Sequence, residues 1–120
     1  MGKVRAATIA AALAAVPAAQ AASWQPVGSS ADSRPYESIA QLMKSGLRNV
    51  HGFRVAAGPA GAKVGGEVMC LAGGSVNSYT FAWTVGRTRV KVLKASGTCT
   101  VAAEATLKRG GSVTVTVWMR

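Results

Sequence analysis

The chain has 120 residues, of which 14 are basic, 4 are acidic and one is histidine, so its formal net charge at pH 7 is +10. This length is enough for one domain with one hydrophobic core. The sequence contains neither a glycine-rich nucleotide-binding motif nor the Gly-x-Ser-x-Gly motif of a nucleophilic serine. One histidine and two cysteines are too few for a conventional zinc site, so we predict no metal and no cofactor.

The first 21 residues have the pattern of a cleavable signal peptide. Lys3 and Arg5 form a basic head, and the uncharged run 6–16 that follows is too short to cross a bilayer, which needs about 20 residues. Ala19-Gln20-Ala21 places small residues where signal peptidase requires them. We therefore expect export to a periplasm or the extracellular space, with no transmembrane anchor. The remaining chain has 12 basic and 4 acidic residues, a net charge of 12 − 4 = +8.

Cys70 and Cys99 are the two cysteines, and in an oxidising compartment they allow one intramolecular pairing. Both fall on apolar-facing strand positions, which favours a disulfide inside the sheet layer. Closing this loop of about 30 residues is expected to stabilise the fold by roughly 3–4 kcal/mol.

The first part of the mature chain predicts a lead-in followed by a helix. Residues 22–33 are polar and rich in turn-forming residues, so we expect a flexible lead-in before a single domain over 34–120. Pro35 follows a capping position, and Gly46 is a suitable helix terminator. Apolar residues between these two points have the spacing of one helical face and predict a helix over about 35–45; they are Tyr36, Ile39, Ala40, Met43 and Leu47.

From Val50 to the end, apolar and polar residues alternate with the period of β-strands. Gly65-Gly66 interrupts one strand and predicts a β-bulge. Short glycine-containing turns join the strands, and such turns usually connect antiparallel neighbours. The sequence therefore predicts an α+β fold that is mostly β. In it, the helix packs on a five- or six-stranded antiparallel meander, as a curved sheet or a small barrel or sandwich.

The acidic residues and the single histidine give weak candidates for catalysis. His51 is the only histidine, and a histidine can act as a general base in catalysis. Glu67 follows the expected bulge, and a bulge can direct a side chain into a site. A boundary position half in solvent is the simpler interpretation of His51. A small secreted hydrolase that uses His51, with Glu67 or Glu104, is therefore the third of three functional hypotheses.

The basic residues carry the first hypothesis, which is a non-catalytic interaction module. Arg87, Arg89 and Lys91 share strand parity and would form a strip about 13 Å long. Further candidate binding residues at neighbouring strand ends are Lys94, Lys108 and Arg109. Such a charge attracts an anionic polymer, a lipid head group or an envelope protein. Repeated aromatics for stacking bases are missing, so we do not expect sequence-specific nucleic-acid binding.

The second hypothesis is a structural or assembly subunit of a β-rich assembly. Residues 112–119 alternate between valine and polar residues and carry no charge. If this strand lay at a sheet edge, it could pair with another chain and form oligomers. An internal closing strand is the alternative interpretation of the same pattern.

Overall fold

The computed structural model describes residues 24–120, which fold into six β-strands and contain no helix. The signal peptide predicted over 1–21 lies outside the described residues. The strands are β1 (Gln25–Arg34), β2 (Ser38–Gly58), β3 (Lys63–Ala72), β4 (Ser75–Thr84), β5 (Val90–Leu107) and β6 (Gly111–Met119).

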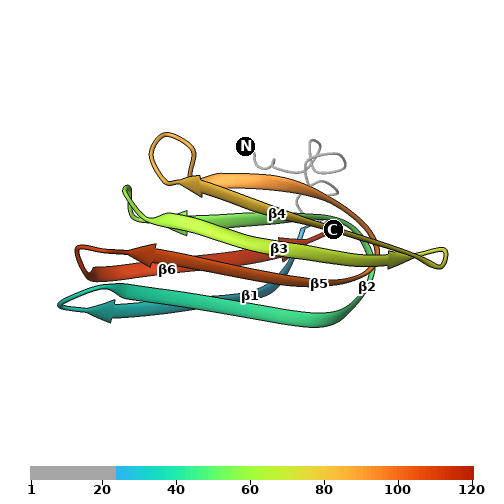
Figure 1. Ribbon diagram of the computed structural model, residues 1–120, viewed down its shortest axis with the longest axis horizontal. Coiled ribbons are helices and arrows are strands. Elements are labelled where there is room, and N and C mark those ends of the chain that lie inside the picture. Colours follow the sequence, from blue (N-terminus) through green and yellow to red (C-terminus); the bar gives the residue numbers. More distant parts are fainter. Residues whose placement is uncertain (1–23) are drawn as a thin grey trace, which may run out of the picture.

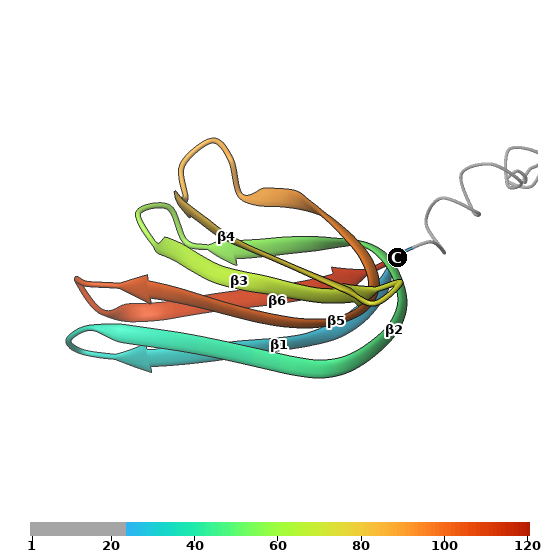
Figure 2. The same ribbon diagram turned by 45° about the vertical axis from the view of Figure 1, so that its right-hand side comes forward.

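All strand pairs are antiparallel, and the order across the sheet is β1-β6-β2-β5-β3-β4. The two longest strands, β2 and β5, bend together, so the sheet folds back on itself into two packed layers (Figures 1 and 2). Layer A contains β4, β3, residues 98–107 of β5 and residues 38–44 of β2. Layer B contains β1, β6, residues 53–58 of β2 and residues 90–94 of β5.

Local sequence explains where the two long strands bend. In β2 the pairing with β5 shifts three times between Lys44 and Gly52, and Gly46 and Asn49 in this stretch have positive φ angles of 70° and 55°. In β5 the bend falls at Gly97, with φ of 107°, where a Cβ atom would collide with the carbonyl group of Leu71. Only glycine avoids both the steric and the conformational cost at that point.

The core lies between the two layers and consists mainly of valine and alanine. Phe53 is its largest fully buried side chain, and Val115 and Val101 represent the inward faces of layers B and A. The Cys70–Cys99 disulfide predicted from the sequence is present and joins directly opposed residues of β3 and β5 on the buried side. It therefore links neighbouring strands within layer A.

The helix predicted over 35–45 is wrong, because residues from Ser38 onward form β2. A helix would have turned the apolar stripe toward the core, but Tyr36 and Met43 are 65% and 71% exposed. The strand alternation instead buries Ala40 and Ser38, and residues 38–44 pair with residues 101–107 of β5. Long-range pairing has overridden a short helical periodicity.

The predicted meander and the predicted bulge are also wrong. Among the described strands, only β3 and β4 are neighbours both in the sequence and in the sheet, and β6 returns to lie between β1 and β2. The pairing of β3 runs through Gly65 and Gly66 without a register shift. Most of the expected lead-in forms strand β1, which pairs with β6 from Gln25 to Arg34.

The molecule has two distinct ends. Four connections meet at one of them, which we call the loop end: 35–37, 59–62, 85–89 and 108–110 (Figure 1, left). At the opposite end, the bend end, β2 and β5 turn between the layers and the chain reaches its C-terminus (Figure 2).

Candidate functional site

Cations gather at the loop end. Arg87 and Arg89 lie in the β4–β5 connection, Lys108 and Arg109 lie in the β5–β6 turn, and Lys63 begins β3 beside them. All five side chains are exposed, and we call them the loop-end cations. Four of them belong to the set predicted from the sequence, whereas Lys63 was missed because it is far from the others along the chain.

Hydrogen bonds hold the connections of the loop end against one another. The Gly61 amide donates to the Val85 carbonyl at 2.8 Å, and the Val85 amide donates to the Ala62 carbonyl at 2.8 Å. Arg109 Nη2 donates to the Ala60 carbonyl at 3.1 Å. The β2–β3 connection is therefore tied to both of the connections that carry predicted cations.

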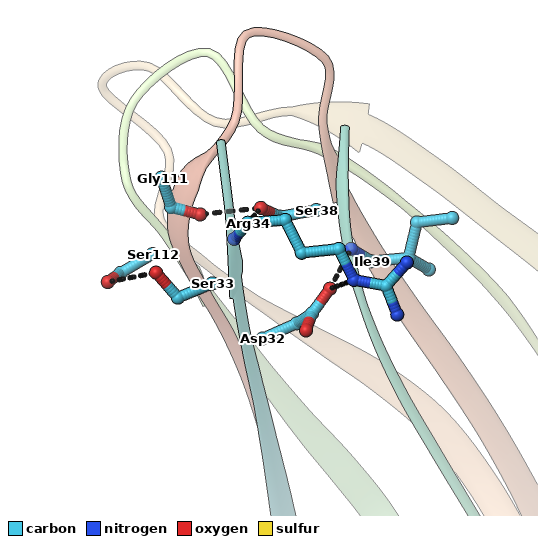
Figure 3. A network of polar contacts seen from close by, with 7 residues as sticks. All are labelled: Asp32, Ser33, Arg34, Ser38, Ile39, Gly111 and Ser112. Carbon is cyan, nitrogen blue, oxygen red and sulfur yellow. Dashed lines mark hydrogen bonds and ion pairs between the residues drawn. The ribbon is translucent and has the colours of Figure 1, made fainter. Parts of the chain in front are cut away.

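A polar network closes the far side of the loop end, between β1, β2 and β6 (Figure 3). The buried Ser38 hydroxyl accepts from the Arg34 amide at 3.0 Å and donates to the Gly111 carbonyl at 2.7 Å. Asp32 accepts from the Ile39 amide at 2.8 Å and forms an ion pair with Arg34 at 3.1 Å. The Ile39 amide, helped by the Arg34 guanidinium, lowers the pKa of Asp32 below its usual value. Its carboxylate is thus engaged within the fold.

The two remaining predicted binding residues lie apart from this cluster. Lys91 is in layer B, with its Nζ 5.6 Å from the centroid of the Trp83 ring, at the edge between the layers. Lys94 lines a hollow of about 380 Å³ at the bend end, together with His51 and Tyr79. The expected strip of Arg87, Arg89 and Lys91 does not run along one strand, because the first two lie in a connection.

A larger, shallow groove of about 570 Å³ crosses the outer face of layer A. Its side chains come from three neighbouring strands: Gln41 on β2, Glu104 on β5 and Glu67 on β3. Gly65 lies at its floor, and a Cβ atom there would meet only the Phe81 carbonyl oxygen at 3.7 Å. The groove is therefore open because this position has no side chain, rather than because packing forbids one.

Hydrogen bonds orient both carboxylates of the groove. Gln41 Nε2 donates to Glu104 Oε1 at 3.0 Å, and the Ser78 hydroxyl donates to Glu67 Oε2 at 3.0 Å. His51 lines the other hollow, which shares no lining residue with the groove, so the structure does not bring His51 and Glu67 into one site. Among residues 24–120, no group of three or more histidine, cysteine, aspartate or glutamate side chains could hold a metal ion.

An arginine–tryptophan cluster lies on the outer face of layer B, and its two arginines, Arg54 and Arg120, were not among the binding residues predicted from the sequence. The Arg54 guanidinium lies 4.3 Å from the centroid of Trp118 and 5.1 Å from that of Trp24, and Arg120 lies 4.5 Å from Trp24. Arg54 and Trp118 are direct partners across β2 and β6. These contacts fix the first and last described residues to the sheet. The alternation along β2 and β6 puts Arg54 and Trp118 on the outer face, but their contact could be predicted only if the pairing of these two strands were known.

Comparisons with known proteins give likenesses of fold at low identity. No protein-family model matches the chain, and no curated protein matches it. Among solved structures, TmCBM61 in complex with β-1,4-galactotriose matches with a TM-score of 0.49 and 12% identity, over 75% of this chain and 68% of that chain.

Two further solved structures match with lower TM-scores. The C-terminal domain of A223, a structural protein from Sulfolobus turreted icosahedral virus, has a TM-score of 0.44 and 8% identity, over 81% of this chain and 98% of that one. The low-affinity xylan-binding module CBM86 from Roseburia intestinalis has a TM-score of 0.37 and 11% identity, over 83% and 90%. All three scores lie below 0.5, so the ligands of these proteins do not bear on the site described above.

In the described part of the chain, no helix is long and apolar enough to span a membrane.

Proposed function

We propose that residues 24–120 form an exported, non-catalytic binding module that holds an anionic polymer through its loop-end cations. The observation that carries the proposal is the convergence of Lys63, Arg87, Arg89, Lys108 and Arg109 from three separate parts of the chain. The loop end also holds two carboxylates: Asp32 is engaged by Arg34 and Ile39, and Glu37 is exposed in the β1–β2 connection. The five loop-end cations therefore leave this end with a net positive charge. The disulfide supports folding in an oxidising compartment.

Physical chemistry favours a polymeric ligand over a single small anion. The loop-end cations are exposed and belong to turns or strand ends, so each isolated contact is weak in water. A polyanion meets several of them at once and releases its condensed counterions, which makes the combined binding strong and dependent on salt. Sulfated or phosphorylated polysaccharides and other envelope polyanions have this chemistry.

Heparin affinity measured by calorimetry tests the proposal, with two charge-matched variants. Arg87→Gln/Arg89→Gln removes two loop-end cations, and Lys44→Gln/Arg48→Gln removes two exposed cations from the bend of β2. We expect the loop-end variant to bind heparin about tenfold more weakly and to reduce the salt-dependence slope by about one unit for each lost contact. Equal losses in the two variants would mean that only net charge matters, and the proposal would fail.

A second candidate function rests on the groove of layer A. Its open floor at Gly65 and its oriented Gln41, Glu67 and Glu104 side chains offer acceptors and donors to the hydroxyl groups of an uncharged oligosaccharide. The two carboxylates repel a polyanion, so this ligand class is separate from the first.

Neutral xylan and galactan oligosaccharides, titrated by nuclear magnetic resonance, test this second candidate. Gly65→Leu should block the groove, since a Cβ atom at Gly65 meets only the Phe81 carbonyl oxygen at 3.7 Å and the side chain would extend into the groove. Wild-type shifts confined to the groove and absent in Gly65→Leu would support it. An unchanged wild-type spectrum at about 10 mM oligosaccharide, where even weak binding is visible, would refute it.

A further inference from the structure

The two folded layers have four lateral edges, and three of them carry features that block pairing with another strand. At the β1 edge, Pro26 has no amide hydrogen, and the register shifts between Pro26 and Gly28. At the edge formed by residues 38–44 of β2, Asp32 already accepts from the Ile39 amide. At the edge formed by residues 90–94 of β5, Lys91 and Lys94 are exposed. Such devices prevent edge-to-edge association.

The fourth edge, β4, has no proline, no register shift and no charged residue of its own, and the cation beside it is Lys91 of β5, whose Nζ lies over the Trp83 ring. The strand has ten residues, Ser75–Thr84. β3 is its single neighbour among the described strands. Alternate backbone amides and carbonyls along about 34 Å of this strand therefore point away from the sheet.

The side chains of β4 also suit further pairing. Tyr79, Phe81 and Trp83 face the core but are only partly buried, because β4 leaves their outer side uncovered. The Tyr79 hydroxyl is buried without a hydrogen-bond partner, and burial raises the pKa of this phenol. The opposite face carries small residues such as Thr80 and Ala82, which present no steric obstacle to a neighbouring strand.

We infer that β4 pairs antiparallel with β4 of a second copy of this chain, forming a two-fold dimer through a continuous sheet. An antiparallel pair with a two-fold axis at Thr80 places Tyr79 opposite Phe81 of the second copy and Ser78 opposite Ala82. Each contact is then made twice, as a two-fold interface requires. The strand that forms the contact has no charged residue of its own, so its pairing places no like charges directly opposite each other, although each copy carries +8.

This inference goes beyond polyanion binding and has the opposite dependence on salt. Salt screens the repulsion between two cationic copies, so the dimer should become tighter as ionic strength rises, whereas polyanion binding should weaken. Failure of one model therefore leaves the other intact. An antiparallel dimer would also point the two loop ends in opposite directions, so one dimer could bridge two polymer chains.

Sedimentation equilibrium of the oxidised mature chain, residues 22–120, at about 0.05 M and about 0.5 M salt, tests the inference. We expect a monomer–dimer equilibrium with the dissociation constant lower at high salt. Ala82→Lys introduces a charge at the β4 edge and should weaken the dimer at least tenfold. The matched control Ser29→Lys adds the same charge at the β1 edge and should leave the dimer unchanged.

Hydrogen exchange provides a second readout that does not depend on a variant. Amides of β4 that point away from β3 should exchange more slowly as the protein concentration rises, while those of β1 should not change. A monomer at both salt concentrations up to about 0.5 mM would overturn the inference. Equal weakening by Ser29→Lys and Ala82→Lys, or protection at β1 instead of β4, would do the same.

Discussion

Gly65 and Gly66 are neighbours in β3, yet the structure predicts opposite effects when each is changed to alanine. A Cβ atom at Gly66 would collide with the Ala102 carbonyl oxygen and with the Phe81 ring. The Ala102 carbonyl belongs to β5, which is paired with β3 at this point, so it cannot move without disturbing a sheet contact. The Phe81 ring packs against the core and can move only by changing that packing. At Gly65 the nearest obstacle is the Phe81 carbonyl oxygen at 3.7 Å, an ordinary van der Waals contact.

The expected magnitudes follow from these distances. Overpacking against a rigid sheet costs about 3 kcal/mol for Gly66→Ala, at the upper end of what inserted methyl groups cost. For a domain of this size each 1 kcal/mol lowers the melting temperature by about 4–8 °C, so we expect a decrease of about 12–24 °C. Gly65→Ala should raise stability by about 0.5–1 kcal/mol, because alanine restricts the unfolded chain and fits the strand.

Thermal and urea unfolding of the oxidised protein, followed by circular dichroism, measures both effects. The double variant Gly66→Ala/Phe81→Ala is the control. Because the ring is removed, Gly66→Ala should lower the free energy of unfolding less in the Phe81→Ala background than in the wild type. If the free energies of unfolding of Gly65→Ala and Gly66→Ala differ by less than about 0.5 kcal/mol, then Phe81 and Ala102 do not approach Gly66 as closely as described.

Three further predictions concern the disulfide and two titrating groups. Replacing Cys70 and Cys99 by alanine should lower the free energy of unfolding in urea by about 3–4 kcal/mol, because the bridge spans a sequence separation of 29 residues; a loss below about 1 kcal/mol would contradict this. The pKa of Asp32 is lowered from 3.8, so its ionised form stabilises the fold above that pH, and the contribution is lost as pH falls through the folded value. Asp32→Asn should therefore flatten the acid limb of the stability curve, and an unchanged limb would refute the assignment. Burial raises the pKa of Tyr79 above 10.0, so its contribution is present below that pH and lost as pH rises through the folded value; Tyr79→Phe should remove a late phase from the ultraviolet titration.

Strand positions in the second half of the chain were predictable because they depend on local alternation. The strand expected over 112–119 coincides closely with β6, and the expected strand that contains Gly65-Gly66 is β3. The pairing of Cys70 with Cys99 followed from counting, since two cysteines allow one bridge. These features need no knowledge of which strand lies beside which.

Features that depend on strand order were not predictable in the same way. Residues 38–44 have a helix-like spacing of apolar residues, and only their pairing with residues 101–107 of β5 makes them a strand. The strand 112–119 was considered as an edge for assembly, but β6 lies between β1 and β2 and has no free edge. The edge strand without charged residues is β4 instead. Its alternation of apolar and polar residues predicts a strand but does not indicate which strands lie beside it.

The candidate site shows the same division between local and long-range information. Four of the six predicted binding residues meet at the loop end, because turns that are distant in sequence close the same end of the two layers. Lys91 and Lys94 belong to β5, which runs away from the loop end. The alternation of side chains along the sequence therefore grouped them with cations that lie elsewhere in the fold. Whether the loop-end cations bind a polymer stays a prediction for the heparin titration.

The stacking of Trp24 on Arg54 and Arg120 has a practical consequence for engineering. It holds the first and last described residues side by side at the bend end, and the Arg120 amide donates to the Gly52 carbonyl at 3.0 Å. A fusion partner or surface tether attached at either terminus would therefore leave the loop end pointing outward. A short linker between residues 24 and 120 would also allow circular permutation, with new termini opened at Gly73-Gly74 between β3 and β4.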